Sequence, residues 1–216
     1  MNDLTCIFLT VNKVPKEWAE YHKRVTLEAI GDTPVISVSK EPLDWGINII
    51  QDETPSISCI YKQILRASKM ASTAFIAVIE DDTLYHKSHF SHRPKGDVTY
   101  NFHRWGLFTW GTPTFYYKDR ISNACMIARR ESLIKTLEER FEKYPENRIG
   151  EVGKEKGTTI NRLDVEHYWS DVGTVYLSHV NSLDPTEQHK SKKMGSVKAY
   201  EIPYWGRAED IRKEWK

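Results

Sequence analysis

Residues 73–90, with the sequence TAFIAVIEDDTLYHKSHF, are the stretch around which the rest of the chain is organised. The stretch begins with an apolar run at 74–79, and a short run without polar alternation predicts a strand buried on both faces of a parallel sheet. The run stops at three carboxylates, Glu80, Asp81 and Asp82. Adjacent acids repel one another, so a fold that keeps them together usually supplies a cation. Because ligands bind at the carboxyl ends of strands in open α/β sheets, we expect a cation site here.

The segments on both sides predict alternating helices and strands. The first strand, helix and second strand form a βαβ unit, which implies a parallel sheet with a right-handed crossover. With 216 residues and 39% hydrophobic content, the chain is long enough for one α/β domain with a substantial core. Strands are predicted at 4–11, 34–39, 47–50, 122–128 and 174–178, short strands within 97–117, and helices at 17–30, 56–70, 131–144 and within 200–216.

Two of the predicted helices carry further expectations. In the first, apolar residues at steps of three and four predict a buried stripe, and in the second Ser56 is a plausible N-cap. Lys62 lies on another face of the second helix, where its ammonium group either reaches phosphates or is an ordinary solvated charge. The stripe of the first helix consists of Trp18, Tyr21, Val25 and Ala29.

The composition narrows the class of protein. A net charge of +1 argues against a strongly basic coat for nucleic acid and gives no attraction to a membrane. Cys6, Cys59 and Cys125 are far apart and form no Cys-x-x-Cys pair, so we expect free thiols in a reducing compartment and no zinc site. No segment is apolar and long enough to be a signal peptide or a membrane span, so we expect a cytoplasmic protein, in the host cytoplasm if the protein is viral.

Three histidines follow the acidic residues at steps of three, at His86, His89 and His92. On a helix this spacing would place three imidazole rings on one face. Pro94 and Gly96 argue against a long helix, so solvent-exposed or hydrogen-bonded histidines are favoured over a zinc site.

The acidic triplet resembles the DxD-type metal motif of glycosyltransferases with the GT-A fold. The residues that follow it, TLYH and SHF, and the upstream segment 58–65, SCIYKQIL, resemble those of small phage glycosyltransferase-like, DNA-modifying proteins. The resemblance is good over residues 4–90 and looser beyond them. It implies an α/β, GT-A-like (Rossmann-like) single domain over 1–216, with a mostly parallel central sheet, flanking helices and a smaller acceptor-side β region. Residues 1–96 would be the nucleotide-binding half, 97–183 the acceptor half, and 184–216 a tail over the site.

The resemblance also implies roles for particular residues. Carboxylate and imidazole ligands together suit Mn²⁺ or Mg²⁺, and an acid would take the proton from the acceptor hydroxyl. Each group also has a structural alternative, such as a turn, a salt bridge or a core contact. The implied metal ligands are Glu80, Asp82 and His179; the implied donor contacts are Thr10, Asn12, Lys62, Asp81, Lys192 and Lys193; the implied acceptor contacts are His103, Arg104, Trp105 and Trp110; and the implied base is Glu166 or, second, Asp164.

The leading hypothesis is therefore a metal-dependent glycosyltransferase that uses a nucleotide-sugar donor, with a UDP-sugar as the first choice. The phage resemblance suggests a hydroxymethylated base in DNA as the acceptor. A nucleotidyltransferase is the alternative, but it normally has a glycine-rich basic loop after its first strand, where residues 10–15 here contain no glycine. A non-catalytic nucleotide-binding module is the third reading, and both a monomer and a homo-oligomer remain open.

Overall fold

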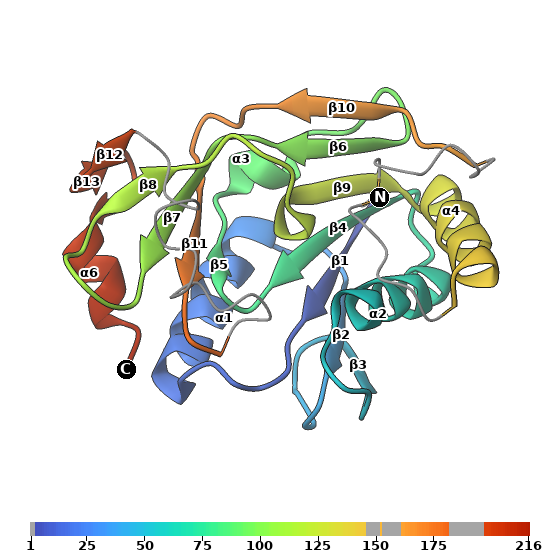
Figure 1. The fold of residues 1–216 in the computed structure, drawn as a ribbon, viewed down its shortest axis with the longest axis horizontal. Coiled ribbons are helices and arrows are strands. Elements are labelled where there is room, and N and C mark those ends of the chain that lie inside the picture. Colours follow the sequence, from blue (N-terminus) through green and yellow to red (C-terminus); the bar gives the residue numbers. More distant parts are fainter. Residues whose placement is uncertain (1–2, 146–151, 153–160, 182–196) are drawn as a thin grey trace.

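The computed structural model describes residues 3–145, 152, 161–181 and 197–216. Within these residues, a central sheet of seven strands forms the body of the molecule (Figure 1). β9 is antiparallel to both of its neighbours, and the other four strand pairs are parallel. This confirms the predicted α/β class with a mostly parallel sheet. In spatial order the strands are β10 (Val165–Tyr168), β6 (Val98–Asn101), β9 (Met126–Arg129), β4 (Phe75–Glu80), β1 (Leu4–Leu9), β2 (Val35–Ser39) and β3 (Ile47–Ile50).

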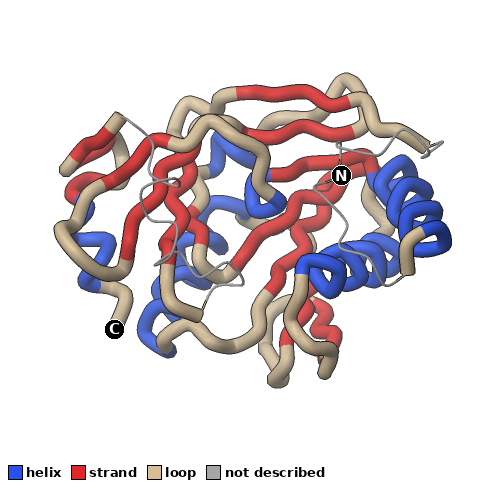
Figure 2. The backbone as a smooth tube through the Cα atoms, in the orientation of Figure 1, coloured by secondary structure: helices blue, strands red, loops and turns tan. Residues whose placement is uncertain are grey.

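A smaller sheet lies beside the central one, on the side of the chain's C-terminus (Figures 1 and 2). Its order is β12 (Lys198–Ala199), β8 (Phe115–Tyr117), β7 (Arg104–Phe108), β11 (Thr174–Ser178) and β5 (Thr83–Leu84). A short pair, β13 (Glu201–Ile202) and β14 (Gly206–Arg207), follows. The helices are α1 (Lys16–Ile30), α2 (Ile57–Met70), α3 (Lys87–Phe90), α4 (Arg130–Lys143) and α6 (Ala208–Lys213), with a 3-10 turn at Asn123–Cys125.

Strand β1, next to the middle strand β4 of the central sheet, is buried on both faces. Ile7 and Leu9 pack into the cluster that includes residues of α2 and α4, whereas Cys6 and Phe8 pack into the cluster on the side of α1 and α3. Burial of each such large side chain stabilises the fold by about 1.5–3 kcal/mol. The alternation of these side chains therefore fixes which helices cover which face. Cys6 is buried and free, as are the other two cysteines.

The predicted buried stripe of α1 is only partly correct. Trp18 is fully buried, but Tyr21 and Val25 are half-buried, and His22 and Thr26 are buried instead. The reason is a polar contact, because a ring nitrogen of His22 lies 2.9 Å from the carbonyl oxygen of Thr83. Burial lowers the pKa of His22 to about 4, so its imidazole is neutral at pH 7. The predicted N-cap of α2 is confirmed: the backbone N–H of Cys59 donates to Ser56 Oγ at 3.0 Å.

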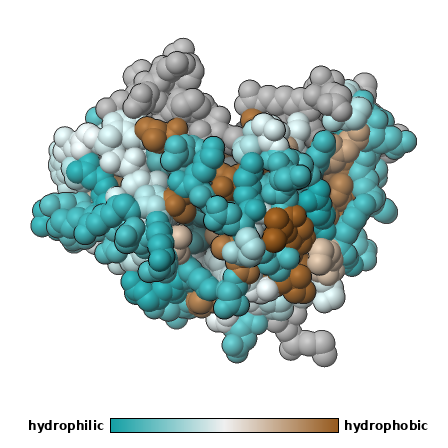
Figure 3. Space-filling view, turned by 90° about the horizontal axis from the view of Figure 1, so that it is seen from below, coloured by the Kyte–Doolittle hydropathy of each residue, from teal (hydrophilic) through white to brown (hydrophobic). Residues whose placement is uncertain are grey.

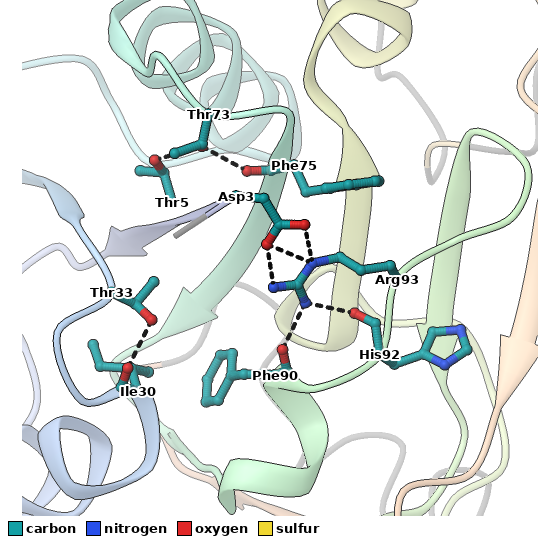
Figure 4. A network of polar contacts seen from close by, with 9 residues as sticks. All are labelled: Asp3, Thr5, Ile30, Thr33, Thr73, Phe75, Phe90, His92 and Arg93. Atoms are coloured by element: carbon teal, nitrogen blue, oxygen red, sulfur yellow. Dashed lines mark hydrogen bonds and ion pairs between the residues drawn. The ribbon is translucent and has the colours of Figure 1, made fainter. Parts of the chain in front are cut away.

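An arginine ties α3 to the start of β1 (Figure 4). The Arg93 guanidinium donates to both carboxylate oxygens of Asp3 and also to the carbonyl oxygens of Phe90 and His92. This ion pair lowers the pKa of Asp3. The contact fixes α3 against the sheet at the amino end of β1, opposite the end that carries the acids.

The face drawn in Figure 3 is largely hydrophilic, with its apolar side chains in separate patches. The edge strand β3 exposes Ile47 and Ile50 by 56% and 57%. Among the described residues, no helix has the length and hydropathy to span a membrane.

Candidate functional site at the junction of the two sheets

The acidic residues form the connection between the two sheets. β4 of the central sheet ends at Glu80, and β5 of the smaller sheet begins at Thr83. Asp81 and Asp82 are therefore the two-residue link, at the carboxyl end of β4. The backbone N–H of Leu177 in β11 donates to the carbonyl oxygen of Asp82 at 2.7 Å. This bond aligns the end of β11 with the acids.

That alignment brings Asp82 and His179 together, and their role as metal ligands stays a prediction. His179 follows β11 directly, and its Nε2 lies 3.6 Å from Asp82 Oδ2. The side chain of His179 is 7% exposed. The hydroxyl of Thr83 donates to the other oxygen of Asp82 at 3.0 Å, which orients the carboxylate. One carboxylate and one imidazole thus face each other from the ends of two strands that are far apart in the sequence.

Asp81 is oriented differently from Asp82. The hydroxyl of Thr10, at the end of β1, donates to Asp81 Oδ2 at 2.5 Å, and the backbone N–H of Asn12 donates to Thr10 Oγ1 at 2.9 Å. Trp18 Nε1 donates to the carbonyl oxygen of Asp81 at 2.7 Å. Asn12 has a φ of 55°, and its Oδ1 accepts from the backbone N–H groups of residues 40 and 41. Thr10 and Asn12 therefore hold the loops around the site, and their predicted contact with nucleotide stays a prediction.

Burial makes the acids of this site hard to ionise. Burial, together with the charges of Asp82 and Asp81, raises the pKa of Glu80 to about 8, against the lowering effect of the Arg104 guanidinium. Burial and the charge of Asp82 raise the pKa of Asp81 to about 7, against the lowering effect of the Thr10 hydrogen bond. Carboxyl groups whose pKa values lie this far above their ordinary range are typical of functional sites. A cation among them would favour the ionised carboxylates and so lower these pKa values.

Two cavities meet at Thr10 and Asp81, since both residues line both cavities. The first, of about 430 Å³, lies beside α1 and is lined by the rings of Phe8, His22 and Trp45, with charged residues at its rim. The second, of about 630 Å³, contains the acids, His179 and residues of α2. It is also lined by Leu9, Val11, Lys13, Val14, Pro55, Ile60, Gln63, Val180 and Asn181.

The residues present fit a divalent ion that binds together with a ligand. Among the described residues, no group of three or more His, Cys, Asp or Glu side chains is arranged to hold a metal ion by itself. Asp82 and His179 supply the oxygen and nitrogen donors that Mn²⁺ accepts. Ions such as Mg²⁺ are commonly bound by one or two carboxylates together with substrate phosphates and water. The pair therefore suits a site that is completed by a diphosphate.

Several predicted donor contacts lie elsewhere. Lys62 is exposed on α2, and its ammonium group lies 5.9 Å from the ring centre of Phe141 on α4, which favours the solvated-charge reading. Lys192 and Lys193 lie outside the described residues.

The structure does not bring the two predicted bases to the acids. Glu166 is on β10, and both β6 and β9 lie between β10 and β4. Its carboxylate accepts from the backbone N–H of Gly96. Asp164 lies just before β10, where its backbone N–H donates to Asp97. The spacing of Asp164 and Glu166 in the sequence does not indicate which edge of the sheet β10 would occupy. The observed position of β10 leaves the predicted catalytic role of these two acids without a geometric basis.

The four residues predicted to contact the acceptor lie at different positions in and around β7. The ring Nδ1 of His103 lies 2.7 Å from the carbonyl oxygen of Ser170, and the half-buried Trp105 packs against the core of the smaller sheet. Arg104 is buried, with its guanidinium 4.7 Å from the ring centre of Tyr176. Only Trp110 among the four follows the carboxyl end of β7, next to Thr109, whose backbone N–H donates to Ser178. Because β7 and β11 are parallel, Trp110 and His179 lie at the same end of the smaller sheet, where both strands finish.

The three histidines after the acids do not form a metal site in the described part of the chain. His89 is fully buried, and its Nδ1 lies within hydrogen-bond distance of Asn101 and Tyr168. His92 stacks on Tyr168 at 4.1 Å. The expectation of hydrogen-bonded histidines is met at His89, and burial lowers its pKa to about 3.

Sequence reasoning missed residues that reach the site from distant segments. Trp18, predicted as a core residue, also donates to the backbone of Asp81. Trp215, near the C-terminus, packs against His179 with ring centres 4.8 Å apart. Gln63 of α2 is buried and lines the second cavity. A Trp or Gln at such a position has no local signal, because its role depends on which strands become neighbours.

The chain matches no protein-family model and no curated protein. Its likeness is to solved structures. TarS from S. aureus matches with a TM-score of 0.51 and 13% identity, over 82% of this chain and 37% of TarS. The fold is GT-A-like. The mannosyltransferase PcManGT from Pyrobaculum calidifontis, in complex with GDP-Man and Mn²⁺, matches at 0.46 and 13% identity, over 85% of this chain and 58% of that chain.

A nucleotidyl-transferring enzyme matches as well. The 2-C-methyl-D-erythritol 4-phosphate cytidylyltransferase from Thermus thermophilus has a TM-score of 0.44 and 11% identity, over 76% of this chain and 88% of that chain. The chain thus spans less than two thirds of TarS and of the mannosyltransferase. At these identities the likeness concerns the fold, and one fold can carry several activities. Nothing in these comparisons supports the resemblance to DNA-modifying phage proteins.

Proposed function

We propose that the protein is a metal-dependent glycosyltransferase that moves a sugar from a nucleotide-sugar donor to a hydroxyl group. The observation that carries the proposal is the approach of Asp82 and His179, with 3.6 Å between Oδ2 and Nε2, beside a cavity of about 630 Å³. These two side chains would hold Mn²⁺ or Mg²⁺, and Glu80 would add negative charge beside them once the ion favours its ionised form. The ion, when bound, would offset the charge that develops on the leaving diphosphate.

The other residues of the site would bind and orient the donor. The cavity beside α1 is lined by aromatic rings, and flat rings are suited to stacking on a nucleobase. Asn12 lines this cavity, and Thr10 lies where it meets the second one. A nucleoside in the first cavity would thus place its diphosphate across Thr10 and Asp81, next to the metal ligands. Lys192 and Lys193 stay as proposed partners of the diphosphate.

The choice of donors to test begins with UDP-sugars, which the sequence resemblance suggests. TarS has been solved with UDP and with UDP-GlcNAc, and the mannosyltransferase with GDP-Man, so GDP-sugars are the second set to screen. On the acceptor side, Trp110 is the predicted contact whose position best fits the proposal. A hydroxymethylated base in DNA is retained as one acceptor to test, because the sequence resemblance suggested it.

Nucleotidyl transfer is the second candidate, since enzymes of that class also use acids after a buried strand to hold Mg²⁺, and Glu80 to Asp82 follow such a strand here. The two reactions release different products. A glycosyltransferase releases a nucleoside diphosphate from a nucleotide sugar, whereas a nucleotidyltransferase releases pyrophosphate from a nucleoside triphosphate and a sugar phosphate. Residues 10–15 contain no glycine, and the Thr10 hydroxyl in this segment donates to Asp81. Both observations favour glycosyl transfer over nucleotidyl transfer.

The deciding experiment is a thermal-shift screen of UDP- and GDP-sugars with and without Mn²⁺, followed by an assay for both products. We expect a rise in melting temperature that requires both the metal and one nucleotide, and release of nucleoside diphosphate. Binding without release of either product would point to a non-catalytic module. Pyrophosphate release with no diphosphate would support the second candidate instead.

A further inference from the structure

The C-terminal segment reaches the metal site through the indole ring of Trp215. Its ring centre lies 4.8 Å from that of His179, with the planes at 39°, and 5.1 Å from that of Trp18. Trp18 in turn donates its indole N–H to the carbonyl oxygen of Asp81. One side chain therefore contacts both the proposed imidazole ligand and the residue that fixes the backbone of the neighbouring acid.

The segment that carries Trp215 is docked on the strands of the site. Ala208 and Ile211 of α6 are buried in the cluster that contains Leu84 of β5 and Leu177 of β11. β5 follows the acids, and β11 precedes His179. The backbone N–H of Trp215 donates to the carbonyl oxygen of Arg212 at 3.1 Å, which continues the turn of the helix towards His179. Movement of α6 would thus change the surroundings of both proposed ligands.

His179 lies beyond the last residue of β11, so the strand ladder does not by itself set its ring orientation. Packing against an indole restricts the side-chain torsions of the imidazole and keeps its Nε2 towards Asp82. We propose that Trp215 is a positioning residue, which holds the His179 imidazole in the orientation that a divalent cation needs. This rests on the proposed function. Residues that orient metal ligands without touching the metal typically change its affinity by about 10- to 100-fold.

The test is Mn²⁺ binding in the presence of UDP or GDP, measured by isothermal titration calorimetry on the full chain. We expect Trp215→Ala to weaken Mn²⁺ binding by about tenfold. Trp215→Phe keeps an aromatic ring against His179 and should restore most of the affinity. The histidine ring signals in NMR spectra give a second readout, since the His179 ring should become mobile in Trp215→Ala and remain ordered in Trp215→Phe.

Ile211→Ala is the matched control for docking of the segment. Ile211 is buried on the same helix and belongs to the cluster beneath it. We expect this variant to lower the melting temperature but to bind Mn²⁺, per folded molecule, nearly as well as the unaltered protein. An equal loss of affinity in Ile211→Ala and Trp215→Ala would overturn the proposal, because general docking would then explain both.

The two proposals fail in different ways. If the unaltered protein binds Mn²⁺ with a nucleotide and Trp215→Ala binds it equally well, the positioning role is wrong and the proposed function stands. If the unaltered protein binds no Mn²⁺ with either nucleotide while Asp82→Asn behaves identically, the metal site itself is wrong and both proposals fall.

Discussion

The hydroxyl of Thr10 donates a hydrogen bond to Asp81 Oδ2 across the ends of two adjacent parallel strands. Both residues line the two cavities that meet at this bond. The neighbouring Asp82 instead faces His179. Two consecutive acids are thus directed to different partners, one towards the end of β1 and one towards the end of β11. Of the two acids, only Asp82 faces the other proposed metal ligand.

Replacing Thr10 by Val removes the hydroxyl and keeps the shape of the side chain. Because the hydrogen bond lowers the pKa of Asp81, its loss should raise that pKa further above about 7. The variant should also lose about 1 kcal/mol of stability. Thr10→Ser is the control that keeps the donor. Urea unfolding, together with the pH at which Mn²⁺–nucleotide binding is half-maximal, measures both effects; an unchanged pH midpoint in Thr10→Val would contradict the coupling.

The raised pKa values predict how stability depends on pH. Glu80 and Asp81 have values of about 8 and about 7, against ordinary values of 4.5 and 3.8. Between about pH 4 and about pH 8, the folded state therefore binds more protons at these two carboxyl groups than the unfolded state does. The contribution of these groups to stability is greatest at low pH and is lost as the pH rises through this window.

Divalent cations should act in the opposite direction, because they bind the ionised carboxylates and displace protons. We expect the stabilisation by Mn²⁺ and nucleotide to grow from about pH 6 to about pH 8.5. Melting temperatures measured across this range, with chelator and with metal, check both trends. In Glu80→Gln, the decrease in melting temperature with rising pH, measured without metal, should become smaller. If this substitution leaves the decrease unchanged, other titratable groups cause it.

Asp82→Asn tests the proposed metal ligand directly. The amide keeps the shape of the side chain and removes its charge, so Mn²⁺ affinity in the presence of nucleotide should fall by at least about 100-fold. Asp52→Asn changes an exposed acid outside the two cavities and is the matched control. Isothermal titration of both variants gives the comparison, and equal affinities would remove Asp82 from the site.

Asn12 should contribute to the stability of the fold through its hydrogen bonds to the loop after β2. Its left-handed backbone suits Gly and strains Ala, and its Oδ1 accepts from two backbone N–H groups of the loop after β2. Asn12→Gly should therefore cost about 1–2 kcal/mol through the lost hydrogen bonds, and Asn12→Ala should cost more. Chemical denaturation measures the order of the two variants. An equal loss in both would mean that the backbone conformation contributes nothing.

Glu166→Gln decides whether the sequence-predicted base has a catalytic role. Glu166 is separated from β4 by β6 and β9, and its carboxylate binds the backbone at Gly96. We therefore expect a modest change in melting temperature and, if the proposed function holds, turnover within about threefold of that of the unaltered protein. Loss of a general base typically lowers the rate by about 10²–10⁴-fold. A loss of that size would restore the original assignment and require that β10 approaches the acids during the reaction.

Local sequence patterns were sufficient for most of the elements. The apolar run before Glu80 predicted β4, and the run before His179 predicted β11 with its bounds. Helix α4 was predicted within one residue at each end. These elements have strong periodicity or continuous apolar character, and their burial follows from the hydrophobic effect alone. The polar residues His22 and Thr26 on the buried side of α1 were missed because their partners lie on other elements.

The sequence by itself determined that a buried strand ends in three acids and that a late strand ends in a histidine. It could not determine that Asp82 and His179 meet while Glu166 does not, because strand order depends on long-range pairing. It could not show that Trp215 packs on His179 either, since that contact requires the C-terminal helix to dock beside β11. Hydrophobic periodicity reports how one segment is buried, whereas a site is made by the packing of several segments together.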